Sequence, residues 1–246
     1  MLKELSIARV AVVSALALLA AVPAQAHFIW VLVGSEAPQT RIVLAENPAD
    51  EMTDDLVPKI SAKAWDASGK ELAFSQGKKS WNGPADFSKA IAAQQTWGLM
   101  DHGGKPFLIE YYAKGGASIA ETANEMKLPF ELYARQDGAE VVATLKHQGK
   151  PAADSKVNVY LPTGRTLELQ TDAKGEVRFA AEGGGHYGLR SRLIEARKGE
   201  SEGKAYDEVR HYTTLAFALP GPAAPKAPPA AAPAGEHGEA AKHGGN

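Results

Sequence analysis

Apolar residues recur along the chain in short runs that alternate with polar residues or turn signals. Residues 28–33 and 41–44 are rich in aromatic and β-branched side chains, and residues 60–65 alternate before a Gly-containing turn. No segment has a long helical periodicity. We therefore predict strands at 28–33, 41–44, 60–65, 107–112, 128–134, 140–146, 156–161, 165–171, 176–180, 186–192 and 210–217, with short helices or turns only at 50–57 and 119–126.

The strand spacing predicts an all-β protein with two β-sandwich domains. Turn residues at 135–138 separate an N-terminal β domain, residues 27–136, from a second domain, residues 137–219. In the second domain the strands recur every 8–12 residues, which is typical of an immunoglobulin-like or transthyretin-like sandwich. Its turn at Asp172–Gly175 ends in a glycine, which indicates a positive φ at that position.

The two ends of the chain have a different composition from these domains. Residues 1–26 combine Lys3 and Arg9 with an apolar run at 10–22 and end in Ala-Gln-Ala, the pattern of a cleavable signal peptide. The run is too short to span a membrane. Cleavage after Ala26 would release a periplasmic or secreted protein without stable membrane insertion. Residues 220–246 are rich in Ala, Pro and Gly, which predicts a disordered tail.

The composition limits the partners, metal ligands and catalytic groups that the chain can have. The formal net charge is −2 and no basic stripe is present, so we expect no nucleic-acid partner. The chain has no cysteine, which excludes disulfides, thiolate zinc sites and cysteine nucleophiles. A metal would have to bind to imidazole and oxygen ligands, which suit Ni, Co, Cu or Zn. The sequence has no nucleophile elbow, phosphate-binding loop or dinucleotide motif, so we expect no enzymatic activity.

Histidines supply the candidate metal ligands. Cleavage after Ala26 would make His27 the first residue, and its free α-amine and imidazole could chelate one metal ion. A second imidazole would complete the site; of the possible partners His102, His147, His186 and His211, His102 and His186 rank first and His211 next. His102 lies in a polar glycine-containing turn, whereas His186 and His211 lie in predicted strands. His147 precedes a turn and is expected to lie on the surface.

Several segments resemble one family of exported proteins. In the first half these are Ala26–Trp30, Trp97–Met100, Pro106–Lys114 and Lys127–Glu131. In the second half they are Gly149–Pro151, Thr171–Gly175 and Gly199–Leu215, within which Tyr206–Leu215 is the most specific. Together they are similar to the DUF4198 family, which is associated with periplasmic components of nickel and cobalt uptake. The resemblance implies metal handling and a membrane transport component as a partner.

Three functions remain open at this point. The first is an exported, non-catalytic protein that binds Ni, Co or Cu through His27 and another histidine, and supports metal uptake. The second is a structural or interaction module whose sandwiches hold a protein or carbohydrate partner. The third is a copper-dependent oxidative enzyme, because such an enzyme would also use an N-terminal histidine chelate.

Overall fold

The computed structural model describes residues 27–34, 40–50, 52–84 and 89–222. The predicted signal peptide and residues 223–246 of the predicted tail lie outside this part. The described residues form strands and two short 3-10 helices, which confirms the all-β prediction. The elements are β1 (Phe28–Leu32), β2 (Arg41–Ala45), η1 (Val57–Lys59), β3 (Lys63–Asp66), β4 (Glu71–Leu72), β5 (Ser75–Gln76), β6 (Trp81–Asn82), β7 (Ile91–Asp101), β8 (Pro106–Gly115), η2 (Ile119–Ala123), β9 (Phe130–Asp137), β10 (Glu140–His147), β11 (Lys150–Pro151), β12 (Lys156–Tyr160), β13 (Thr166–Gln170), β14 (Glu176–Ala180), β15 (Gly185–Glu195), β16 (Gly199–Ser201), β17 (Lys204–Tyr206) and β18 (Glu208–Leu219).

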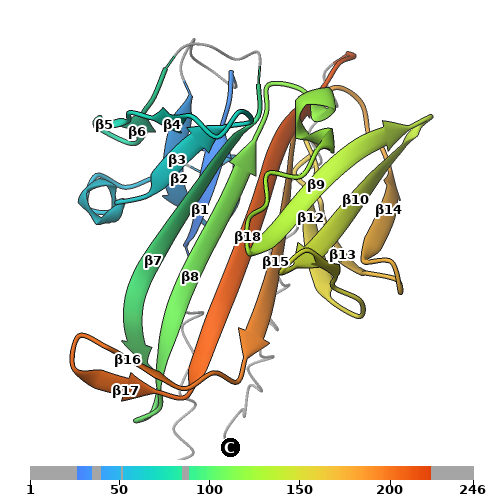
Figure 1. Ribbon diagram of the computed structural model, residues 1–246. Coiled ribbons are helices and arrows are strands. Elements are labelled where there is room, and N and C mark those ends of the chain that lie inside the picture. Colours follow the sequence, from blue (N-terminus) through green and yellow to red (C-terminus); the bar gives the residue numbers. More distant parts are fainter. Residues whose placement is uncertain (1–26, 35–39, 51, 85–88, 223–246) are drawn as a thin grey trace, which may run out of the picture.

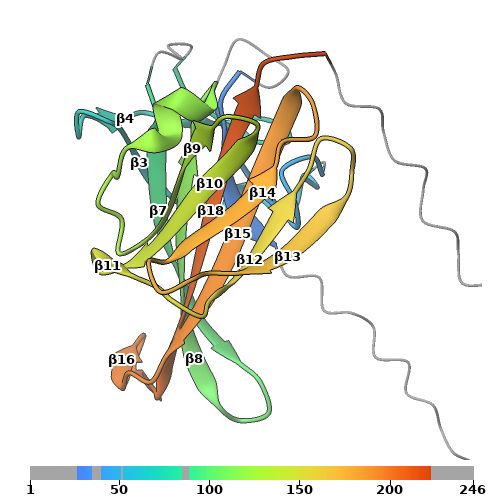
Figure 2. The same ribbon diagram turned by 90° about the vertical axis from the view of Figure 1, so that its right-hand side faces the viewer.

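A central sheet of eight strands organises the molecule. Its strand order is β13-β12-β15-β18-β8-β7-β3-β4. A second sheet, β1-β2-β6-β5, packs on one face of the central sheet, and a third sheet, formed by β9, β10, β11 and β14, packs on the other. Figures 1 and 2 show the long strands β7, β8, β18 and β15 running between these two smaller sheets. The fold therefore has three layers.

The central sheet buries side chains on both of its faces. Successive residues of a strand point to opposite faces, so Tyr111 lies in the core under β1 and β2, whereas Tyr112 lies in the core under β9 and β10. Ala216 and Phe217 of β18 divide between the two cores in the same way. Burial on both faces explains why residues 107–112 read as a nearly continuous apolar run.

The parallel pairing of β8 with β18 joins the two predicted domains. In this pairing Phe107 faces Glu208, and the register continues to Gly115 and Ala216. The predicted boundary falls at the turn between β9 and β10, which pair as an antiparallel hairpin. Residues 27–136 and 137–219 therefore contribute strands to the same central sheet, and the two cores share this layer.

Some elements differ from the expected ones. β7 was not predicted, and it carries a bulge at Trp97, where the register with β8 shifts between Thr96 and Gly98. β10 and β15 extend past their predicted ends, to His147 and Glu195. The predicted helical segment at 119–126 contains the short η2, whereas η1 begins at Val57, the last residue of the predicted segment 50–57, and ends at Lys59.

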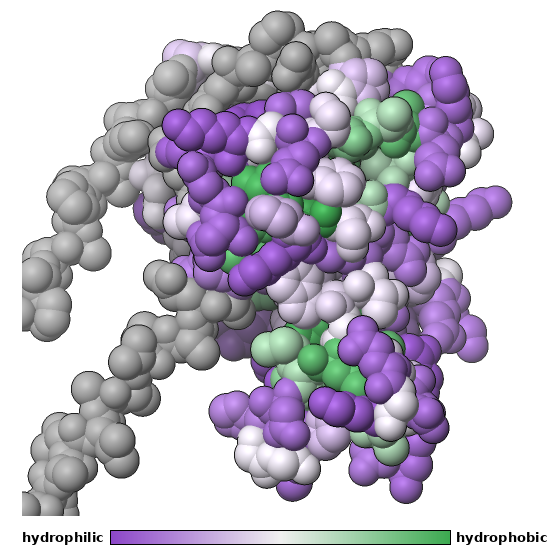
Figure 3. Space-filling model, turned by 90° about the vertical axis from the view of Figure 1, so that its left-hand side faces the viewer, coloured by the Kyte–Doolittle hydropathy of each residue, from purple (hydrophilic) through white to green (hydrophobic). Residues whose placement is uncertain are grey.

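The surface of the described residues is mostly polar. Met100 and Ile194 are the only large apolar side chains among them that are exposed. On the face seen in Figure 3, apolar residues form separate patches with hydrophilic residues between them. None of the helices in the described part has the length and apolar character needed to cross a bilayer.

Candidate metal centre

One group of potential metal ligands stands out in the described part of the chain: His147, Glu195 and His211. A ring nitrogen of each histidine and a carboxylate oxygen of the glutamate all lie within 4.8 Å of one another. Glu195 ends β15 and His211 lies in β18, so both belong to the central sheet. His147 ends β10 in the third sheet. The cluster therefore bridges two layers, beside the end of β10 that adjoins β11 (Figure 2).

Strand register explains why Glu195 and His211 meet. Glu195 faces Val209 and His211 faces Leu193 in the antiparallel β15–β18 pair. The two side chains are therefore diagonal neighbours on one face of the sheet, within reach of a long side chain. This face of the sheet carries the core under β9 and β10, because Leu193 packs against that core.

Two hydrogen bonds fix the ring of His211. Its Nε2 lies 2.9 Å from Oε2 of Glu195, and its Nδ1 lies 3.2 Å from the hydroxyl of Tyr112. The ring also stacks on the Tyr112 ring, with an interplanar angle of 16°. Only 2% of His211 is exposed. Both ring nitrogens are thus engaged, and the imidazole has a defined orientation.

His147 completes the cluster from the third sheet. Its ring centroid lies 5.4 Å from that of His211, and the edge of Phe130 packs against it. Its Nε2 is buried and has no hydrogen-bond partner among the described residues. A buried polar atom without a partner costs roughly 1–3 kcal/mol. The expectation that His147 is a surface residue was wrong, because β10 continues to this residue and carries its half-buried ring to the central sheet.

Electrostatics favour a neutral imidazole beside a charged carboxylate. Burial lowers the pKa of His211, an effect that the Glu195 carboxylate opposes and the nearby His147 reinforces. The pKa of Glu195 lies below its ordinary value, chiefly because His211 hydrogen-bonds to it. Neutral imidazole and ionised carboxylate are the forms that coordinate metals. The Arg197 guanidinium lies 3.4 Å from Oε2 of Glu195 and would repel a metal ion.

The predicted ligands do not form one group in the described residues. His211 joins the cluster, but His27, His102 and His186 do not. The main-chain oxygen of His27 accepts a hydrogen bond from Tyr111, which places His27 on the opposite face of the central sheet from His211. His102 is exposed in the turn between β7 and β8, whereas His186 is exposed near the far end of the sheet, where it pairs with Ala218.

Glu195 was missed in the sequence, and His147 was considered but assigned to the surface. The strand containing Glu195 was predicted to stop at residue 192, so Glu195 was not placed in a strand. Extending the alternation of Tyr187, Leu189, Ser191 and Leu193 by one step would have placed Glu195 on the core-facing side. No pattern within the sequence links His147 to His211, because the contact depends on how two sheets pack.

No protein-family model matches this chain, and a search of curated proteins also finds no match. The similarity to the DUF4198 family therefore stays a prediction.

Proposed function

We propose that the chain is an exported, non-catalytic periplasmic protein that binds a transition-metal ion at His147, Glu195 and His211. The observation that carries this proposal is the buried Nε2 of His147, which has no hydrogen-bond partner in the described part of the chain and lies beside a second imidazole and a carboxylate. A bound cation would provide that partner. It would also neutralise the charge of Glu195 at the boundary between two layers.

The three proposed ligands favour some metal ions over others. Two imidazole nitrogens and one carboxylate oxygen suit Ni, Co, Cu or Zn, and disfavour Mg and Ca, which prefer oxygen ligands. Three protein ligands leave coordination positions for water or for a ligand from another molecule. Such an open site is suited to a metal that is taken up and passed on. We propose delivery to a membrane transport component, in line with the DUF4198 resemblance and the predicted signal peptide.

Calorimetry with Ni(II), Co(II), Cu(II) and Zn(II) tests the site. We expect one equivalent of at least one of these ions to bind, and we expect His147→Ala and Glu195→Gln to weaken this binding at least tenfold. The exposed His102 and His186 provide matched controls, and His102→Ala and His186→Ala should leave the affinity unchanged. Equal affinity in His147→Ala and the unchanged protein would contradict the proposal.

The N-terminal chelate at His27 is a separate proposal and needs its own test. Its α-amine exists only after cleavage behind Ala26. In protein that starts at His27, an added glycine before His27 should remove any equivalent bound by the chelate and should leave the cluster equivalent intact. His147→Ala should have the opposite effect. Unchanged stoichiometry and affinity after the glycine addition would rule out the chelate.

A further inference from the structure

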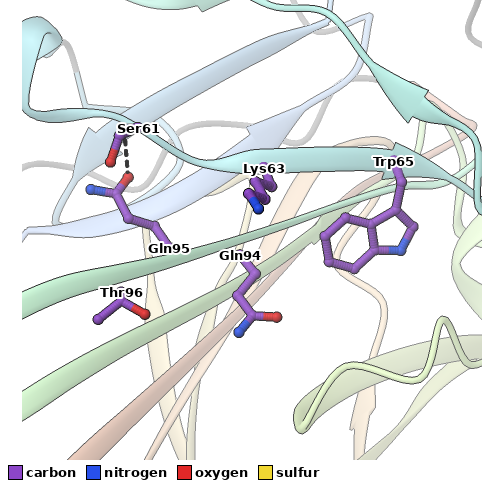
Figure 4. Close-up of a pocket in the computed structure, with 6 residues that line it drawn as sticks. All are labelled: Ser61, Lys63, Trp65, Gln94, Gln95 and Thr96. Atoms are coloured by element: carbon purple, nitrogen blue, oxygen red, sulfur yellow. Dashed lines mark hydrogen bonds between the residues drawn. The ribbon is translucent and has the colours of Figure 1, made fainter.

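A hollow of about 500 Å³ lies at the β3–β7 side of the central sheet (Figure 4). Its size is within the range of about 300–1,000 Å³ that is typical of small-molecule sites. Across β3 and β7, Lys63 pairs with Gln94, and Trp65 pairs with Ala92. Lys63, Gln94 and Trp65 therefore share one face of the sheet. The hollow is lined by Ser61, Lys63, Trp65, Gln94, Gln95 and Thr96.

Trp65 differs from Trp30 and Trp97 in its surroundings, whereas it shares with Trp81 an indole N–H that has no hydrogen-bond partner among the described residues. Trp30 is fully buried and donates its indole N–H to the oxygen of Ala45, and Trp97 packs edge-on against Tyr111. Trp65 is half-buried, and within the described part of the chain its ring contacts no other aromatic ring and its N–H has no hydrogen-bond partner. In Figure 4 the plane of its indole ring faces the viewer, and Gln94 lies beside the ring.

The polar side chains around Trp65 are of two kinds. Gln95 is fixed, because its amide accepts from the N–H of Ser61 and donates to the oxygen of Lys59. This bond pair holds the segment before β3 against β7. In contrast, the amide of Gln94 and the ammonium of Lys63 have no hydrogen-bond or ion-pair partner among the described residues. The hollow thus combines a rigid wall with uncommitted donors and an uncommitted acceptor.

This combination matches the chemistry of sugars. A pyranose ring has a face of C–H groups, which packs on a flat aromatic ring, and a rim of hydroxyls, which need both donors and acceptors. A purely apolar ligand would leave the Gln94 amide and the Lys63 ammonium without partners, at a cost in free energy. We propose that this hollow is a carbohydrate site in which a sugar ring stacks on Trp65 and its hydroxyls bond to Gln94 and Lys63.

Saturation-transfer NMR on the full chain tests the proposal with three probes: cellobiose, N,N′-diacetylchitobiose and digalacturonate. We expect at least one disaccharide to bind saturably, with a dissociation constant in the millimolar range or below. Trp65→Ala should weaken this binding at least tenfold. Gln94→Ala and Lys63→Ala should each weaken it severalfold, and the digalacturonate signal should respond most to Lys63→Ala.

Trp81→Phe is the matched control, because Trp81, like Trp65, is half-buried and packs against a core, but it does not line the hollow. It should leave the binding unchanged. If Trp65→Ala does not fold, Gln94→Ala and Lys63→Ala carry the test alone, since both residues are polar and incompletely buried. Absence of saturable binding by all three disaccharides would overturn the proposal. Binding that is unaffected by the Gln94 and Lys63 variants would overturn it as well.

Discussion

At the scale of single residues, the Tyr112 hydroxyl can hydrogen-bond to either neutral tautomer of His211. Without metal, Nε2–H of His211 donates to Glu195, and Nδ1 accepts from the Tyr112 hydroxyl. A metal bound at Nε2 would require the proton on Nδ1, which would then donate to the Tyr112 oxygen. A hydroxyl can serve in both roles because it is both a donor and an acceptor.

Replacing Tyr112 by phenylalanine should therefore weaken metal binding without displacing a ligand. Loss of such an orienting hydrogen bond typically costs about 10–100-fold in metal affinity, and calorimetry would measure it. Tyr160→Phe is the control, because the Tyr160 hydroxyl has no hydrogen bond to the described residues and its ring packs on the other core. Equal losses in both variants would exclude a specific role for Tyr112.

A second residue-scale feature is the buried ion pair of Lys114 and Glu131. Their side chains are 0% and 3% exposed, and Lys114 Nζ lies 3.1 Å from Oε1 of Glu131. Glu131 also accepts hydrogen bonds from the N–H groups of Met126 and Leu128. Burial lowers the pKa of Lys114, while Glu131 acts in the opposite direction. The carboxylate thus holds both the lysine and the segment before β9.

Removing Glu131 should destabilise the fold more than removing Lys114. Glu131→Ala leaves a buried ammonium, and breaking such a pair costs about 3–5 kcal/mol. Lys114→Met leaves Glu131 with its two N–H donors, so we expect a smaller loss of about 1–3 kcal/mol. Urea denaturation would measure both. The control is Lys156→Met, because Lys156 and Glu168 form a pair in which each side chain is 62% exposed, and such pairs contribute about 0–1 kcal/mol. The reverse order of the two losses would contradict this account.

From the sequence, imidazole was predicted as a ligand, but the three residues that form the cluster were not predicted together. His211 was a candidate because a chain without cysteine has no thiolate ligand, so that imidazoles and oxygen groups are its main side-chain ligands. Glu195 was not considered and His147 was set aside as a surface residue, because each lies at the end of a strand, where predicted boundaries are least reliable. Their meeting depends on register and on the packing of two sheets, neither of which appears in local periodicity.

At the scale of elements, two hairpin turns carry glycines with positive φ. Gly138 has φ of 62° and Gly175 has φ of 74°, and the second value confirms the turn predicted at Asp172–Gly175. A Cβ at Gly138 would meet nothing within 4 Å, whereas a Cβ at Gly175 would lie 2.5 Å from the oxygen of Leu145. Gly175 therefore serves both the turn and the close approach of β10.

Alanine at these two positions should separate the two effects. Gly138→Ala should cost about 1–2 kcal/mol, the penalty for a left-handed residue with a Cβ. Gly175→Ala should cost that amount plus a clash that adds about 1–3 kcal/mol. Chemical denaturation of both variants gives the difference directly. Equal costs would show that β10 can move away from the turn without loss.

The same turn predicts a pH dependence. The Asp172 carboxylate accepts hydrogen bonds from the N–H groups of Lys174 and Glu176, each at 2.8 Å, and these bonds hold its pKa below the ordinary value of 3.8. The stabilisation is therefore present above about pH 4 and is lost as the pH falls through the folded-state pKa. Urea unfolding between pH 6 and pH 3 should show a shallower pH dependence in Asp172→Asn. An unchanged slope would contradict the assignment.

Strands were predicted correctly where the local sequence alternates clearly between polar and apolar residues. The strand at 156–161 alternates between polar and apolar residues, and the structure has β12 at nearly the same bounds. β7 was missed because its residues 92–95 read Ala-Ala-Gln-Gln, which has neither strand propensity nor alternation. That strand forms because β3 and β8 flank it, so its neighbours in the sheet override its local preference.

At the scale of the whole molecule, the cluster of His147, Glu195 and His211 connects two layers. His147 belongs to the third sheet, and Glu195 and His211 belong to the central sheet. An ion held by all three would stabilise the folded state, because the unfolded chain does not hold these ligands together. Binding would then oppose separation of the β9–β10 hairpin from the central sheet.

Metal should therefore raise the melting temperature. At a free metal concentration of 100 times the dissociation constant, binding stabilises the fold by about 2.7 kcal/mol. For a domain of this size that corresponds to a shift of roughly 5–10 °C. Calorimetric scans with metal, and again after EDTA, would measure the shift and its reversal. His147→Ala should abolish it, and a full shift in that variant would place the stabilising metal elsewhere.

The three-layer arrangement was predictable only in part. The fold class follows from the strand patterns, but the two cores do not divide at residue 136, because each contains residues from both sides of it. The shared layer does not follow from these patterns, because it depends on the parallel pairing of β8 with β18, two strands that are far apart in the sequence. The near-continuous apolar run at residues 107–112 is the local sign of a strand buried on both faces.

The position of β18 also affects the order in which the molecule can be assembled. β18 is the last strand of the described residues, yet it lies in the interior of the central sheet, between β15 and β8. Because the chain is synthesised from its N-terminus, β7, β8 and β15 are complete before β18, the strand that connects β8 with β15. Until then, β8 and β15 each have an open edge, which can pair with other chains. Closure requires contacts between distant residues and is therefore slow. A polypeptide released before residue 208 would lack the strand that joins its two halves.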